Sequence, residues 1–217
     1  MILNLLFPNR CLRCNRIITS KEIVCELCFD QIHFTHYLFN ANNLLKEKCR
    51  LLFPVENAYA LMQFEEESLS REIVHQLKYG RREKIGKTLA EWVTERVDFG
   101  NDPPDFFVTV PLHAKKLRKR GYNQLHLFAD TLSKHYGIPC DHNLLKRNAN
   151  RRAQATKDRI HRAETESLFT CTREVTDKHI LLVDDVFTTG NTMSSVAWEI
   201  LKSGNNRISV LVMAEDY

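Results

Sequence analysis

The chain has 217 residues, enough to bury the core of one domain and to carry a small appended unit without help from disulfides. Its composition is 43% hydrophobic and 27% charged, with 7 glycines and 6 prolines, which excludes collagen-like, low-complexity and wholly disordered proteins. The 31 Lys and Arg residues against 27 Asp and Glu give a net charge of +4, so only the distribution of charge is informative.

The start of the chain does not resemble a targeting segment. Residues 1–7 are apolar, but they have no basic start and Pro8 follows them directly. A signal peptide has a longer apolar run and a small-residue cleavage site. The sequence also contains no run near the ~20 apolar residues that span a bilayer. We therefore expect a cytoplasmic protein without membrane insertion.

Four of the seven cysteines form two Cys-x-x-Cys pairs near the start of the chain. They are Cys11 with Cys14 and Cys25 with Cys28. Each pair supplies two thiolates from one tight turn, so together they predict the tetrahedral shell of a structural Zn²⁺ ion. The alternative interpretation is a redox pair. Apolar segments with strand and helix spacing begin only after Pro54. We therefore expect a zinc-binding unit at residues 1–53 and a second domain at residues 54–217.

The second domain alternates between short apolar runs, which predict strands, and apolar residues at helical spacing. In chain order the expected elements are strand 58–64, helix 69–78, helix 82–96, strand 106–110, helix 122–136, strand 180–183, helix 192–202 and strand 207–213. This alternation predicts an α/β fold with a mostly parallel sheet flanked by helices.

Residues 180–192 form the most specific motif. A buried strand leads to Asp184 and Asp185, and small and hydroxylic residues follow before a helix. Open α/β sheets bind ligands at the carboxyl ends of their strands. The amides of residues 188–192 would lie where a helix N-terminus holds a phosphate, and Gly190 would let the backbone approach closely. Two acids beside such a site suit sugar hydroxyls or a metal ion. The alternative is an acidic pair that only caps the helix.

The run ILLVDDVFTTGNT at these positions resembles the signature of type I phosphoribosyltransferases, which binds 5-phosphoribosyl-1-pyrophosphate (PRPP). The resemblance implies a central parallel sheet, a flexible hood, and PRPP binding with Mg²⁺. By position, Asp184 and Asp185 would take the ribose hydroxyls and residues 188–192 the 5′-phosphate. The PRPP-binding residues expected in this run are Val186, Phe187, Thr188, Thr189, Gly190, Asn191 and Thr192.

Other segments are similar to ComF-type proteins, and the similarity covers nearly the whole chain. They are the four-cysteine start, LKYGRR at 77–82, VPLHAKKLRKRGYNQ at 110–124 and a basic run at 151–162. This resemblance implies an association with DNA uptake in natural transformation. The partners that it suggests are single-stranded DNA and a helicase of the uptake machinery.

Two segments concentrate positive charge. In phosphoribosyltransferases the loop after the second strand holds pyrophosphate, so the resemblance makes Pro111, Leu112 and His113 candidates for that loop. The five cations that follow are Lys115, Lys116, Arg118, Lys119 and Arg120. Clustered cations attract any polyphosphate, so pyrophosphate and nucleic acid are both candidate ligands. The alternative is a solvated basic turn.

The second basic segment, residues 146–162, holds seven cations and one acid. In the family fold it corresponds to the loop that closes over PRPP and neutralises the leaving pyrophosphate. The candidate catalytic cations are Arg151, Arg152 and Lys157. The alternative is a solvated surface loop.

Two functions fit these patterns. The first is an enzyme that transfers a phosphoribosyl group from PRPP to an unidentified acceptor, by positioning and charge stabilisation. The second is a non-catalytic adaptor that senses PRPP or a nucleotide and holds single-stranded DNA or an uptake partner. The pair of Asp184 and Asp185 favours a working PRPP site, because acids beside a phosphate path weaken the binding of a polyanion.

Overall fold

The computed structural model describes residues 8–19, 22–80, 82–148 and 167–216. Their main sheet has five strands in the order β1–β7–β6–β2–β3, and every neighbouring pair is parallel. The strands are β1 (Ala58–Phe64), β2 (Phe106–Thr109), β3 (Cys140–Asp141), β6 (His179–Phe187) and β7 (Arg207–Asp216). A separate antiparallel pair joins β4 (Leu145–Arg147) to β5 (Phe169–Cys171). The expected parallel α/β fold is confirmed.

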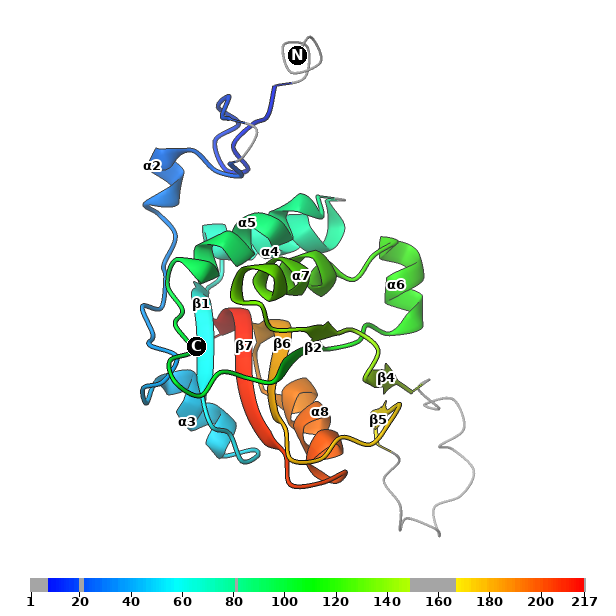
Figure 1. The fold of residues 1–217 in the computed structure, drawn as a ribbon. Helices are drawn as coiled ribbons and strands as arrows, with labels where there is room; N and C mark the ends of the chain where they lie inside the picture. The colour runs from blue at the N-terminus through cyan, green and yellow to red at the C-terminus, as the bar shows by residue number, and fades with distance from the viewer. Residues whose placement is uncertain (1–7, 20–21, 81, 149–166, 217) are drawn as a thin grey trace.

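Helices cover both faces of the sheet (Figure 1). On one face lie α4 (Leu69–Tyr79), α5 (Lys84–Thr94) and α7 (Gln124–Tyr136), and on the other α3 (Leu44–Arg50) and α8 (Asn191–Leu201). Among the described residues, every helix is too short or too polar to span a bilayer.

Burial on both faces explains why the central strand is a continuous apolar run. Residues 180–183 of β6 are completely buried between the two helical layers. Full burial of one such Val, Leu or Ile side chain stabilises the fold by about 1.5–3 kcal/mol. The strand is longer than the expected 180–183, because it continues through two acidic residues to Phe187.

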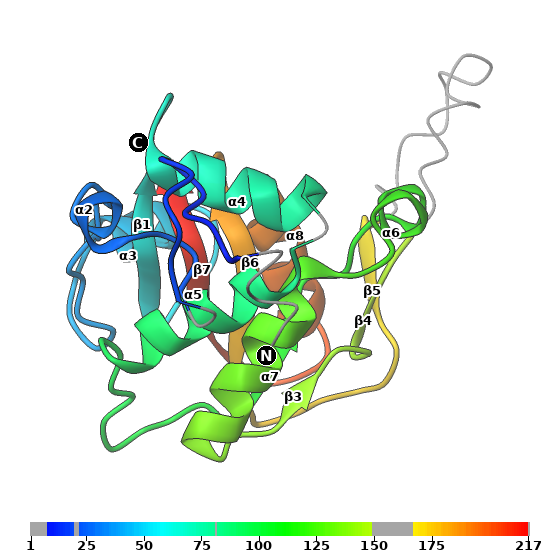
Figure 2. The ribbon, with the colours of Figure 1, turned by 90° about the horizontal axis from the view of Figure 1, so that it is seen from above.

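The basic segment after β2 is a helix where the sequence predicted a loop or turn. This helix, α6 (Ala114–Arg120), begins after His113, whose Nδ1 accepts a hydrogen bond from the Lys115 amide at 3.1 Å. It ends at Gly121, which has a φ of +86°. No residue of α6, which is described in full, is buried, so the helix has no apolar face that the sequence could display. In both ribbon views α6 lies on the same side of the molecule as β4 and β5 (Figures 1 and 2).

The N-terminal segment, which includes α2 (Glu26–Phe29), is attached to the outer edge of the sheet. Residues 33–35 run antiparallel to β1: the Thr35 amide donates to the Leu61 carbonyl at 3.2 Å, and the Gln63 amide to the His33 carbonyl at 2.8 Å. This contact covers an edge strand that would otherwise present unpaired backbone groups. The division of the chain at residues 53 and 54 stays a prediction.

Candidate functional site

The candidate site lies where the parallel strands end. Because all five strands run in the same direction, their carboxyl ends meet at one edge of the sheet, which is where open α/β sheets bind ligands. Asp184 and Asp185 lie in the last part of β6, and residues 188–190 connect this strand to α8. The structure therefore brings the acidic pair and the hydroxylic loop to the same edge.

The loop between β6 and α8 encloses a small polar cavity. Its volume is about 40 Å³, and it is lined by Asp184 and residues 186–193. The cavity lies at the N-terminus of α8, where backbone amides without helical partners and the helix dipole favour an anion. All seven residues expected to bind PRPP in this run, 186–192, are among the lining residues.

Gly190 is required by the shape of this loop. It immediately precedes α8 and has a φ of +74°, in the left-handed region that side chains disfavour. A Cβ atom at this position would overlap the side chain of Leu52 and lie 2.7 Å from Phe187 Cζ. Backbone conformation and packing therefore both exclude a larger residue.

We expect Gly190→Ala to destabilise the protein by about 2–4 kcal/mol, because left-handed strain and overpacking add. The matched control is Gly137→Ala, since Gly137 also has a positive φ, +70°, but open space around the new methyl group. This control should lose only about 1–2 kcal/mol. Urea unfolding of both variants measures the difference, and equal losses would show that the space around Gly190 is not limiting.

Asp184 carries an unfavourable negative charge. Loss of hydration, and then the charge of Asp185, raise the pKa of Asp184 to about 7. The Asp185 amide donates a hydrogen bond to Asp184 Oδ1 at 2.8 Å, which offsets only part of this cost. A cation or a hydroxyl donor beside Asp184 would stabilise its ionised form, which is the chemistry expected of a sugar or metal site.

Asp185 is held by two helices. Successive side chains of a strand point to opposite faces, so Asp185 faces away from Asp184. Its Oδ1 lies 2.7 Å from Lys78 Nζ of α4, and its Oδ2 accepts a hydrogen bond from Gln124 Nε2 of α7. The two acids, for which the sequence predicted one shared role, therefore have different neighbours.

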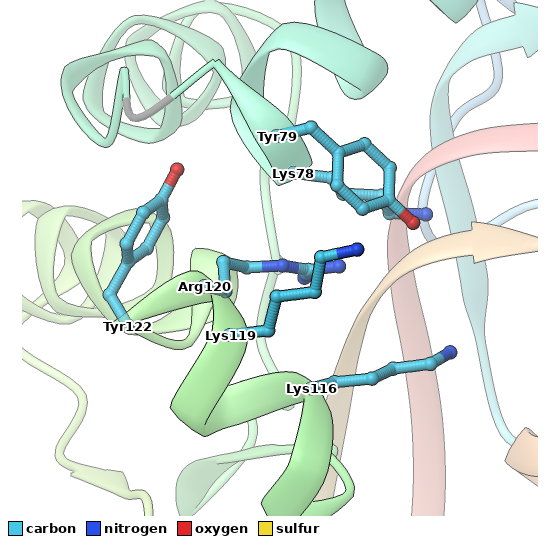
Figure 3. Close-up of a pocket in the computed structure, with 6 residues that line it drawn as sticks. All are labelled: Lys78, Tyr79, Lys116, Lys119, Arg120 and Tyr122. Atoms are coloured by element: carbon cyan, nitrogen blue, oxygen red, sulfur yellow. The ribbon is translucent and has the colours of Figure 1, made fainter.

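A basic pocket adjoins this network. It has a volume of about 480 Å³ and is lined by Lys78, Tyr79, Lys116, Lys119, Arg120 and Tyr122. Figure 3 shows the side chains of Lys78, Lys116, Lys119 and Arg120 extending to the same side of the pocket. Because Lys78 both lines the pocket and pairs with Asp185, the pocket is continuous with the acidic network.

The helical period of α6 divides its five described cations. Lys116, Lys119 and Arg120 line the pocket, whereas Lys115 and Arg118 lie outside the lining. Arg120 packs over the Tyr79 ring, with 5.2 Å between the guanidinium carbon and the ring centroid, and it donates to the Gln124 side chain. Three of the five cations therefore face the candidate site.

The remaining predicted residues have separate places. Pro111, Leu112 and His113 connect β2 to α6, and they are half-buried. Arg151, Arg152 and Lys157 lie outside the described residues. Sequence reasoning did not select Lys78 and Gln124 as site residues. The only sequence signals for them are the segments LKYGRR and GYNQ, in which they occur.

The four N-terminal cysteines converge as predicted. Their sulfur atoms all lie within 4.8 Å of one another, and Cys14 Sγ is 3.6 Å from Cys25 Sγ. Four sulfurs at 2.3 Å from a tetrahedral zinc ion would be about 3.8 Å apart. All four cysteines, which belong to the described residues, are free of disulfide bonds. The cluster fits a closed structural zinc site.

We expect Asp184→Asn to stabilise the protein above neutral pH. A raised carboxyl pKa means that the folded state holds a proton more tightly than the unfolded state, so stability falls as pH rises from about 4 through 7. Asn at this position does not ionise, so the variant does not lose stability in this way. At pH 8 its melting temperature should exceed that of wild type by about 2–4 °C for each kcal/mol of destabilisation that the charge of Asp184 causes.

The control is a carboxyl whose pKa is lowered, so its removal should change the stability in the opposite direction. The Arg207 guanidinium, which hydrogen-bonds to Asp102, lowers the pKa of that carboxyl. Asp102→Asn should therefore be less stable than wild type at pH 8, and the deficit should stay constant down to about pH 4 and shrink only below it, where the carboxyl of wild type becomes protonated. Thermal unfolding from about pH 3 to pH 8 compares the variants. A constant gap for Asp184→Asn across this range would contradict the raised pKa.

Comparison with known families agrees with this architecture. A double zinc ribbon family model matches residues 2–38, and a phosphoribosyl transferase domain model matches residues 77–216. The second match covers more than half of the chain, so the protein belongs to the phosphoribosyl transferase domain family. The zinc-ribbon match and the four-cysteine cluster together support a structural Zn²⁺ ion.

Named relatives confirm the ComF-type resemblance. Competence protein F of Haemophilus influenzae is 27% identical over 96% of this chain and 97% of its own. The DNA utilization protein YhgH of Escherichia coli K12 is 31% identical over 64% of this chain, and the match spans only 63% of that relative's length. Competence protein ComFC of Bacillus subtilis is 34% identical over 47% of this chain and 41% of its own.

Among solved structures, a purine phosphoribosyltransferase from Pyrococcus horikoshii is similar to this chain. The identity is 20% and the TM-score is 0.35, over 64% of this chain and 84% of the other.

Proposed function

We propose that this protein binds PRPP together with Mg²⁺ at the carboxyl edge of the sheet and transfers the phosphoribosyl group to an acceptor. The observation that carries the proposal is the small cavity at the N-terminus of α8, closed by residues 186–193 beside Asp184. Membership of the phosphoribosyl transferase domain family supports a phosphoribosyl compound as the ligand.

In this proposal the amides of residues 188–192 hold the 5′-phosphate, and Asp184 and Asp185 accept hydrogen bonds from the ribose hydroxyls. Carboxylates combined with substrate phosphates are the usual oxygen ligands of Mg²⁺ in proteins, so the residues at this edge fit that ion. When bound, Mg²⁺ supplies positive charge to the phosphate oxygens.

The basic residues would stabilise charge on the leaving pyrophosphate. Lys78, Lys116 and Lys119 line a pocket of about 480 Å³ that adjoins the acidic network. Positive groups that are already in place where negative charge develops lower the barrier of a transfer reaction. We assign the backbone of residues 111–113 to the same pyrophosphate, and we propose that Arg151, Arg152 and Lys157 complete the charge from the segment between β4 and β5.

The cellular role that we propose is the handling of DNA during uptake. The names of the three relatives described above refer to competence and DNA utilization, and these three proteins come from different bacterial genera. The chain spans just under two thirds of the YhgH relatives, so this role is carried over as a proposal.

The test is a calorimetric titration of PRPP with Mg²⁺ into wild type and into Asp184→Asn/Asp185→Asn. Hydrogen bonds to charged groups contribute about 1.5–3 kcal/mol each, so the double variant should bind at least about 100-fold more weakly. Asp141→Asn is the matched control, because Asp141 pairs with Arg173 and lines neither the cavity before α8 nor the basic pocket. It should bind as wild type does.

Wild type that does not bind PRPP would contradict the proposed function. Equal binding by wild type and the double variant would contradict the assignment of the two acids. If wild type alone binds, release of pyrophosphate in the presence of candidate bases and amines then identifies the acceptor.

A second candidate function is a non-catalytic adaptor that holds single-stranded DNA, alone or with an uptake helicase. The observation that favours it is the alternation of aromatic and cationic side chains in the basic pocket. Tyr79 is 58% exposed, follows Lys78 in the sequence and packs against Arg120, and Tyr122 lines the same pocket. Bases stack on exposed aromatic rings while cations contact the phosphates, and this combination binds single strands without sequence preference.

We expect Lys116→Ala/Lys119→Ala to weaken binding of single-stranded DNA and to reduce the slope of log K against log salt by about 1.4, since each phosphate contact contributes about 0.7. The matched control is Lys115→Ala/Arg118→Ala, which removes the same charge from the part of α6 outside the pocket lining. Fluorescence anisotropy at several salt concentrations measures both. Equal effects of the two double variants would show that the pocket is not the DNA contact.

A further inference from the structure

A second group of metal-ligating side chains lies between α7 and β3, away from the four cysteines. His126 and Asp130 are four residues apart on α7, which places them on one face of the helix. Cys140 lies in β3 (Cys140–Asp141), and His142 lies in the bend that follows this strand. The side chains of Asp130, Cys140 and His142, which are of metal-binding types, converge between the helix and the end of the strand.

Asp130 and Cys140 contact the two different ring nitrogens of His142. Asp130 Oδ1 lies 2.8 Å from Nε2 and Cys140 Sγ lies 3.7 Å from Nδ1, so an ion bound to Nε2 beside Asp130 would require the Cys140 side chain to turn toward it. One ligand atom from each of Asp130, Cys140 and His142 can be chosen so that all three lie within 4.8 Å of one another. Ligands bound to zinc at 2.0–2.3 Å in tetrahedral geometry are about 3.3–3.8 Å apart.

Two neighbouring side chains add to this arrangement. The ring of His126 stacks on that of His142, with 4.0 Å between the centroids and 29° between the planes, so it supports one face of the His142 ring. The hydroxyl of Thr109, the last residue of β2, lies 3.0 Å from His142 Nδ1. Ligating histidines commonly use their second ring nitrogen in such a bond, which fixes the orientation of the ring.

We propose that Asp130, Cys140 and His142 form a second binding site for a transition-metal ion of the Zn²⁺ type, with water completing its coordination. Thiolate, imidazole and carboxylate are the protein ligands that zinc uses. Burial raises the pKa of the Cys140 thiol to about 12, with Asp130 and Asp141 as lesser causes, so binding of the ion releases the thiol proton.

Such an ion would stabilise the attachment of β3 to the rest of the sheet. β3 pairs with β2 at only two positions, Phe107 with Cys140 and Val108 with Asp141. An ion shared by α7 and β3 would join both elements beside the end of β2, where residues 111–113 begin. The site is independent of the four-cysteine cluster, because it uses none of the same residues or elements.

The experiment is a count of zinc ions bound per chain, by native mass spectrometry of the full chain titrated with Zn²⁺ alone. We expect two ions for wild type and one for His142→Ala. His135→Ala, on the same helix but outside the cluster, is the matched control and should keep two. One ion on wild type, or two on His142→Ala, would overturn the proposal.

A second variant keeps the proposal testable if His142→Ala fails to fold. The Asp130 side chain is 56% exposed, so Asp130→Asn removes a ligand with little effect on packing. Once the four-cysteine cluster is saturated, further Zn²⁺ should raise the melting temperature of wild type and leave that of Asp130→Asn unchanged. An equal rise in both proteins would show that zinc does not act through this cluster.

Discussion

The contact between Asp185 and Lys78 is the interaction on which the candidate site depends. It joins α4 to the central strand at its carboxyl end, with 2.7 Å between Nζ and Oδ1, and Gln124 adds α7 through the second carboxylate oxygen. A buried carboxylate without partners would cost several kcal/mol, so this acid positions both helices. Because Lys78 lines the basic pocket and Arg120 bonds to Gln124, the same network also shapes the pocket.

The parts of the structure that were predictable from sequence are those where local pattern and burial agree. The run at 180–183 is apolar throughout because helices cover both faces of its strand, and the periodic segments of α4, α5, α7 and α8 each bury one face. The four cysteines could be assigned because their spacing alone specifies two tight turns. Neither prediction needed any long-range contact.

The parts that were missed depend on tertiary contacts or on very short elements. The helix α6 buries no residue, so its basic sequence was indistinguishable from a turn, and the division of its cations between two faces became visible only with the helix. The sequence alone does not distinguish Lys78 from the other lysines, because its role depends on the tertiary contact with Asp185. The strands β3, β4 and β5 have two or three residues, too few to show the alternation that identifies a strand.

The most direct test of the account is a crystal structure of the wild-type protein with PRPP and Mg²⁺. In that structure the 5′-phosphate should lie against the amides of residues 188–192, the ribose beside Asp184 and Asp185, and the pyrophosphate should be directed toward Lys78 and Lys116. A 5′-phosphate bound in the basic pocket, with the loop before α8 left empty, would contradict it.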